Sequence, residues 1–182
     1  MSFWRLLRKV WRHRNDELVV RYTAVGMNST VDAERDRHVL LADYDAVPLE
    51  RVIDSVKELQ RFWNLSDAYV FRTRNGYHIM WFYDIMPFGR VKLILEYASW
   101  VDPMFKFISR YYNYKTIRVQ GKYPEKDIRF VGIVYGDREP TQEEWDIGEL
   151  KRMEHLSLVD PENMEKFNRG RRRLHEKASE ME

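Results

Sequence analysis

Two carboxylates stand two residues apart at the end of an apolar run. Residues 38–47, HVLLADYDAV, are typical of a short buried strand, and Asp43 and Asp45 lie at its end. Because alternate side chains of a strand point to the same face, both carboxylates should project together. Hard divalent ions such as Mg²⁺ and Mn²⁺ prefer carboxylate oxygens and keep waters that substrate phosphates can replace. The pair therefore predicts half of a cation site, with solvated acids at a strand end as the simpler alternative.

A third carboxylate is needed to complete such a site, and Asp102 is the best-placed candidate. It follows a second amphipathic stretch and directly precedes Pro103. An aspartate followed by proline is also a common helix start, in which the aspartate caps the first turn. Asp102 is thus predicted either as a metal ligand or as a helix cap.

A predicted β-hairpin carries a histidine that is a candidate for substrate binding. Two runs rich in β-branched and aromatic residues, AYVFRT and YHIMWFY, flank Asn75-Gly76, which is a strong hairpin signal. If these two residues form the loop, Thr73 lies directly opposite His78, and a hydroxyl and an imidazole project from one face. A buried core histidine with no functional role is the alternative for His78.

The remaining pattern supplies the elements that must hold these residues. Residues 48–63 have apolar side chains at helical spacing after Pro48, and a second helix is expected around residues 91–98. Two further β-like runs, residues 116–119 and 128–135, flank a basic loop. The order β-α-β-β-α-β predicts an α+β domain with a split βαβ, RRM-like arrangement.

Charged helical segments are expected at both ends of the chain. Residues 3–14 carry tryptophans and basic residues at helical spacing, which predicts a helix packed on the domain, a basic face on phosphates or a membrane-surface helix. Thr141 and Glu144 form a capping box. We therefore divide the chain into a domain at residues 1–140 and a charged helical extension at residues 141–182.

Composition limits both the chemistry and the location. The chain has 182 residues, of which 33% are charged, and its formal net charge is +2, so attraction to nucleic acid must come from local basic patches. It has no cysteine, which excludes disulfides, a thiol nucleophile and cysteine-ligated zinc. No apolar run reaches the roughly 18–20 residues of a membrane span, and the N-terminus lacks a signal-peptide core. We expect a soluble, cytoplasmic protein without membrane contacts.

One segment interleaves aromatic and basic side chains. Tyr111, Tyr112 and Tyr114 are flanked by Arg110 and Lys115. Aromatic rings among cations are typical of surfaces on which single-stranded template bases stack. Filling of the core or of the surface is the equal alternative.

Taken in order along the chain, these features resemble the archaeo-eukaryotic primase superfamily, whose members share the primase-polymerase fold. The family's motifs are an apolar run ending in Asp-x-Asp or Asp-x-Glu, a small hydroxyl residue before a glycine turn and a histidine, and an apolar residue followed by Asp. The resemblance covers residues 37–132, with Thr73 in place of the commoner serine. The residues that carry it are Asp43-Tyr44-Asp45, His78, Val101-Asp102, and Arg118 with Lys122.

The resemblance implies a metal-dependent DNA primase or polymerase that adds nucleotides by two-metal phosphoryl transfer. It implies two bound ions, Mg²⁺ or Mn²⁺. Carboxylates would hold the ions, and polar and basic residues would bind the triphosphate. The implied catalytic and metal-ligating residues are Asp43, Asp45 and Asp102, and the implied nucleotide-binding residues are Thr73, Arg74, His78, Arg118 and Lys122.

The implied partners are a DNA template and primer, nucleoside triphosphates, and a helicase or another replication protein, in a mobile element or a compact replicon. Nucleotide addition is a stronger expectation than de novo priming, which often relies on an accessory element. Two alternatives stay open at this point: a non-catalytic nucleic-acid-binding replication module of the same fold, and a metal-dependent nuclease.

Overall fold

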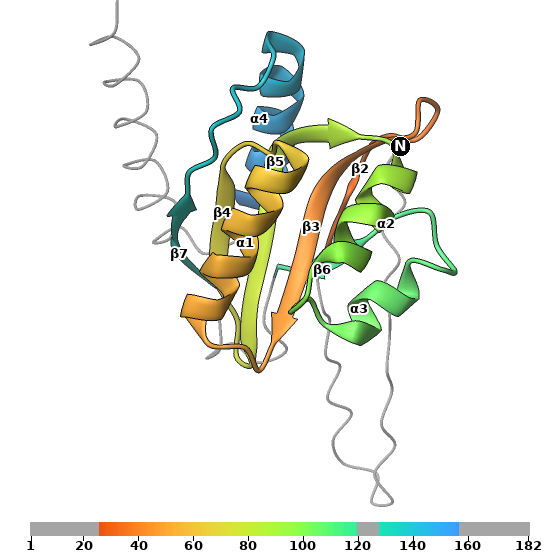
Figure 1. Ribbon diagram of the computed structural model, residues 1–182. Coiled ribbons are helices and arrows are strands. Elements are labelled where there is room, and N and C mark those ends of the chain that lie inside the picture. Colours follow the sequence, from red (N-terminus) through yellow and green to blue (C-terminus); the bar gives the residue numbers. More distant parts are fainter. Residues whose placement is uncertain (1–25, 120–127, 157–182) are drawn as a thin grey trace, which may run out of the picture.

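The computed structural model describes residues 26–119 and 128–156, and Figure 1 shows the arrangement of its elements. The strands are β1 (Gly26–Asn28), β2 (Thr30–Asp32), β3 (Arg37–Asp45), β4 (Ala68–Arg72), β5 (Gly76–Met86), β6 (Thr116–Arg118) and β7 (Arg129–Val134). The helices are α1 (Leu49–Trp63), α2 (Phe88–Tyr97), α3 (Pro103–Ile108) and α4 (Gln142–Leu156). Each helix in these two ranges is too short or too polar to cross a lipid bilayer.

Five strands form one sheet in the order β2-β3-β5-β4-β7. Strand β5 pairs antiparallel with β3 on one side and with β4 on the other. Strands β3 and β4 therefore run in the same direction with β5 between them, and α1 connects the one to the other. The predicted α+β class is confirmed, with sheets that are mostly antiparallel.

Helix α1 covers one face of the sheet. It starts directly after Pro48, and its apolar stripe, which includes Val56, is buried. The Tyr44 hydroxyl of β3 lies 3.1 Å from the Ser55 hydroxyl of α1, so Tyr44 points to this face. The helix predicted for residues 48–63 is therefore confirmed.

Helix α4 covers the opposite face. Asp43 precedes Tyr44 on β3, so its side chain points away from α1, together with its cross-strand partner His78 on β5. Phe71 on β4 lies opposite His78 in turn, and the ring of His155 from α4 is centred 4.5 Å from the Phe71 ring. Figure 1 shows α1 and α4 on the two sides of the sheet. Asp43 and His78 thus share the face on which α4 packs.

The β4–β5 hairpin has a different register from the predicted one. Phe71 lies opposite His78, and the Thr73 N–H donates to the Gly76 carbonyl over 2.9 Å. Gly76 does not have the positive φ that a type I′ turn requires, and it belongs to β5. A Cβ atom at Gly76 would stand 1.8 Å from the Tyr44 carbonyl oxygen. The glycine therefore allows β3 to approach, and the predicted placement of Thr73 opposite His78 is wrong.

Strand β6 lies in a separate two-stranded ribbon. It pairs antiparallel with β1, where Arg118 lies opposite Gly26. Ser29 ties this ribbon to the sheet, because its N–H donates to the Lys115 carbonyl over 2.8 Å and its carbonyl accepts the N–H of Val39 in β3 over 2.9 Å. The ribbon thereby holds Arg118 close enough to β3 to act electrostatically on the site at its end.

Helix α4 begins at the predicted capping box. The Glu144 N–H donates to the Thr141 hydroxyl over 3.3 Å, and the Thr141 N–H donates to the Glu144 carboxylate over 2.9 Å. Arg138 pairs with the same Glu144 and with the buried Asp84 of β5. These contacts tie the start of the predicted extension to the sheet. The helix predicted at residues 3–14 lies outside the described residues.

Candidate functional site

Asp43 and His78 form the centre of the candidate site. They are direct cross-strand partners on β3 and β5, and Nε2 of His78 lies 3.5 Å from Oδ1 of Asp43. The Asp43 side chain is 24% exposed and the His78 side chain 5% exposed. Oδ1 of Asp43 is buried and accepts no hydrogen bond. A buried carboxylate oxygen without a partner is rare, because it has lost its hydration without replacement.

The environment of Asp43 disfavours its charged form. Burial, the neighbouring Asp45 and the nearby Asp102 raise the pKa of Asp43 to about 7, while Arg118 opposes them. Asp45 and Asp102 are therefore each close enough to Asp43 to repel its charge. Ionisable groups whose pKa is shifted by burial and by neighbouring like charges are concentrated at functional sites.

Asp102 lies beside Asp43 and also caps a helix. Its main-chain N–H donates to the Asp43 carbonyl over 2.8 Å, on the edge of β3. Its Oδ1 accepts the N–H of Phe105 over 2.7 Å at the start of α3. The predicted helix cap is confirmed, and it occupies one oxygen of Asp102. The predicted role of Asp102 as a metal ligand stays a prediction.

The donor set has the chemistry that a hard divalent cation requires. Asp43, Asp45 and Asp102 are all oxygen donors, and the unpartnered Oδ1 of Asp43 is the kind of atom that a cation would satisfy. Within residues 26–119 and 128–156, no three His, Asp or Glu side chains gather closely enough to form a complete metal-binding group. The three carboxylates therefore fit a cation by chemical type, and Asp45 and Asp102 both act electrostatically on Asp43, but their side chains do not converge on one metal position in the described structure.

His78 is neutral in this environment. Burial, the Arg118 guanidinium and the nearby His155 lower its pKa to about 3, with a smaller opposing effect from the Arg118 main chain. A neutral imidazole can donate from one ring nitrogen and accept at the other. Arg118 itself is exposed on β6, so its cation faces solvent beside the carboxylates.

Two of the remaining predicted nucleotide-binding residues lie in the turn between β4 and β5. Thr73 lies in the turn, where its hydroxyl accepts the Gly76 N–H over 3.0 Å. Arg74 is exposed at the same turn. Lys122 lies outside the described residues. The structure thus brings His78 and Arg118 close to Asp43, while Thr73 and Arg74 lie in the hairpin turn, whose Gly76 pairs with Asp45 of β3.

Sequence reasoning missed His155, the second histidine of this face. It is fully buried on α4, and neither ring nitrogen has a hydrogen-bond partner. Its ring packs against Phe71 at 4.5 Å and Phe82 at 5.9 Å between centroids, and burial lowers its pKa to about 4. A lone histidine in a charged helical segment gives no signal of such a position.

No protein-family model matches the chain, and no match was found among characterised proteins or solved structures.

Proposed function

We propose that this chain is a small metal-dependent nucleotidyltransferase of the DNA primase and polymerase type, which adds nucleotides to a template-directed 3′-end. The observation that carries the proposal is the buried Oδ1 of Asp43, which accepts no hydrogen bond although Nε2 of His78 lies 3.5 Å away, beside Asp45 and Asp102. Such clustering destabilises the folded state, because like charges repel and a buried carboxylate is poorly solvated. A cation would relieve both effects.

The fold supports the same proposal. Strands β3 and β4 are parallel, with β5 between them and α1 as their connection. In the proposal, this split βαβ unit corresponds to the arrangement that the resemblance implies. Asp43 and Asp45 stand at the end of its first strand. We place the reaction in the cytoplasm, with a DNA template, a primer and a helicase or another replication protein as partners.

Three carboxylates would hold the divalent cations. Asp43 and Asp45 project from β3, and Asp102 would contribute Oδ2, because its Oδ1 caps α3. Bound Mg²⁺ or Mn²⁺ supplies charge neutralisation on the attacking and leaving oxygens of phosphoryl transfer.

Polar and basic residues would orient the nucleotide. Arg118 offers an exposed guanidinium, whose planar donors match phosphate oxygens. Thr73 keeps its own hydroxyl proton as a donor, because its oxygen is the acceptor in the turn. Neutral His78 adds a hydrogen-bond donor without adding charge. In the proposal, Arg74 and Lys122 complete the binding of the triphosphate.

The proposed reaction is a substitution at the α-phosphorus. The 3′-oxygen of the primer bonds to the α-phosphorus, and the bond from that phosphorus to the oxygen shared with the β-phosphate breaks. Pyrophosphate leaves, and the hydroxyl proton passes to solvent. The chain's own contribution is to hold the triphosphate in line and to balance its charge.

Primer extension tests the proposal directly. The protein is incubated with a labelled primer on a template, Mn²⁺ and deoxynucleotides, beside the double variant Asp43→Asn, Asp45→Asn. The matched control is Asp54→Asn, which changes an exposed aspartate on α1, on the other face of the sheet. We expect extension by the wild type and the control, and at least about a hundredfold less by the double variant.

Each other outcome assigns a different function. Shortening of the primer that depends on Asp43 and Asp45 identifies a nuclease. Primer binding without extension or shortening leaves a non-catalytic binding module. Extension by the double variant at the wild-type rate would remove these carboxylates from the reaction altogether.

A further inference from the structure

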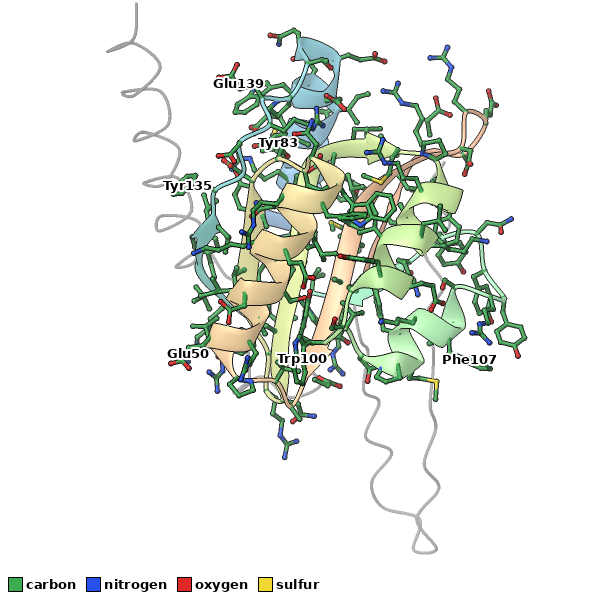
Figure 2. The ribbon with its side chains drawn as sticks, in the orientation of Figure 1. Glu50, Tyr83, Trp100, Phe107, Tyr135 and Glu139 are labelled. Atoms are coloured by element: carbon green, nitrogen blue, oxygen red, sulfur yellow. The ribbon has the colours of Figure 1, made fainter. Side chains whose placement is uncertain are left out.

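Exposed aromatic rings gather at the end of α3 and in the residues that follow it. Phe107 is 43% exposed, Tyr111 69% and Tyr112 45%. The Phe107 and Tyr111 rings meet edge to face, with centroids 5.2 Å apart, and the Arg110 guanidinium lies over the Phe107 ring at 5.7 Å. We call these four residues the aromatic surface. Figure 2 shows Phe107 on the outer side of α3, away from the sheet.

The charge of this segment favours an anionic partner. Residues 103–119 contain four basic side chains and no acidic one. Lys106 and Lys115 turn inward, where each donates to a main-chain carbonyl and where Glu96 of α2 acts on both. Arg110 is exposed within the aromatic surface, and Arg118 is exposed at the carboxylate site. One outward cation, Arg110, therefore lies within the aromatic surface, and a second, Arg118, lies at the carboxylate site.

The aromatic surface is connected to the carboxylate site through one short helix. Asp102 caps the first turn of α3, and the rings begin in its last turn. A helix of six residues spans about 9 Å. The aromatic surface and Asp102 therefore lie at the two ends of α3.

A second group of exposed aromatic residues does not have these properties. Phe62 and Tyr97, on α1 and α2, stack on each other with centroids 4.6 Å apart and planes 16° apart. Because one face of each ring is covered by the other, that group offers less surface for stacking. The α3 segment is the better surface for an anionic ligand with flat rings.

We propose that the aromatic surface binds single-stranded DNA by stacking its bases on Phe107, Tyr111 and Tyr112 while Arg110 contacts its phosphates. The inference rests on the proposed function, which it deepens by assigning the place where the template strand lies. Stacking needs base faces that a duplex hides, so the surface selects single strands over duplexes. A protein partner, which would use the same rings without the charge dependence, is an alternative outcome of the test.

Fluorescence anisotropy with a labelled thymidine oligonucleotide tests the inference. The buffer contains EDTA and no nucleotide, so that binding is measured without catalysis. We expect the double variant Tyr111→Ala, Tyr112→Ala to bind at least about fivefold more weakly per ring removed. Tyr111→Phe, Tyr112→Phe should bind as the wild type does, because the rings remain. Tyr135→Ala is the matched control, since Tyr135 is 58% exposed and lies on the opposite side of the molecule from Phe107 in Figure 2.

The salt dependence of binding separates phosphate contact from stacking. Arg110→Gln should lower the slope of log affinity against log salt by about 0.7, the value for one phosphate contact to a single strand. The tyrosine variants should leave that slope unchanged. A duplex of the same sequence should bind more weakly than the single strand.

The outcomes keep this inference apart from the proposed function. Asp54→Asn, which changes an exposed aspartate on α1, should bind the oligonucleotide as the wild type does. If the wild type binds through the two tyrosines but extends no primer, the strand-binding surface stands and the nucleotidyltransferase proposal fails. If the oligonucleotide binds the alanine double variant as well as the wild type, or does not bind the wild type at all, the inference is overturned whatever the extension assay shows.

Discussion

The main-chain N–H of Asp102 donates to the main-chain carbonyl of Asp43 over 2.8 Å, although 59 residues (102 minus 43) separate the two in the chain. This bond fixes the start of α3 against the end of β3. It is why a helix cap and a strand-end carboxylate belong to one candidate site.

Two variants of Asp102 separate its capping role from its charge. Asp102→Ala should lower the free energy of unfolding by about 1 kcal/mol, because the Phe105 N–H loses its acceptor. Asp102→Asn keeps an oxygen at that position and should stay within about 0.5 kcal/mol of the wild type. Urea unfolding measures both. Primer extension should fall strongly in both variants, and wild-type extension by Asp102→Asn would limit Asp102 to the helix cap.

Gly76 should tolerate no side chain. A Cβ atom there would meet the Tyr44 carbonyl oxygen at 1.8 Å, so the end of β3 would have to move. We expect Gly76→Ala to lower the free energy of unfolding by about 2 kcal/mol or more. Gly132→Ala on β7 is the control, since a Cβ atom at Gly132 has no neighbour within 4 Å. Equal effects of the two substitutions in urea unfolding would contradict the close approach of β3.

The link between β5 and α4 depends on Arg138. Its guanidinium lies 3.1 Å from the carboxylate of Asp84, whose side chain is 2% exposed, and 2.9 Å from that of Glu144. Removing one partner of a buried ion pair leaves an uncompensated charge, so Arg138→Ala should cost about 3 kcal/mol of stability. Adding Asp84→Asn should recover part of that loss. A double-mutant cycle in urea measures the coupling, and strictly additive effects would argue against the pairing.

His155 should make the protein sensitive to acid. Its pKa is about 4 in the folded state against 6.5 for the unfolded chain, so the unfolded state binds more protons below pH 6.5. Stability is therefore complete above pH 6.5 and is lost as the pH falls toward 4. The loss from this group amounts to about 3 kcal/mol, at about 1.4 kcal/mol per pH unit.

The variant His155→Leu tests that contribution. It replaces the imidazole with an apolar side chain of similar size, and it should flatten the acid side of the stability profile by up to about 1.4 kcal/mol per pH unit. His78, whose pKa is also lowered, keeps part of the acid sensitivity in this variant. An unchanged profile would mean that the pKa of His155 is the same in the folded and the unfolded protein.

The local elements could be predicted from the sequence because their signals are local. The apolar stripe after Pro48 specifies α1, and the Thr141–Glu144 pair specifies the start of α4. Alternation along β3 places Asp43 and Asp45 on one face, as expected. Each of these signals depends on neighbours within one or two turns of the chain.

Tertiary contacts decided the features that could not be predicted. Asn-Gly commonly marks a two-residue turn, but Gly76 is needed here for the close approach of Tyr44 from β3. Next to the pairing of β6 with β1, Ser29 forms hydrogen bonds with Lys115. No local pattern in the sequence predicts this long-range pairing. His155 reaches the site only because α4 folds back over β5.

Binding of Mn²⁺ in the absence of nucleotide is the most direct test of the central claim, that Asp43, Asp45 and Asp102 together hold a divalent cation. Electron paramagnetic resonance of free Mn²⁺ measures the bound fraction for the wild type, for Asp43→Asn, Asp45→Asn and for the control Asp54→Asn. We expect saturable binding by the wild type and the control, and at least about a tenfold weaker affinity for the double variant. Equal Mn²⁺ binding by all three proteins would contradict the claim.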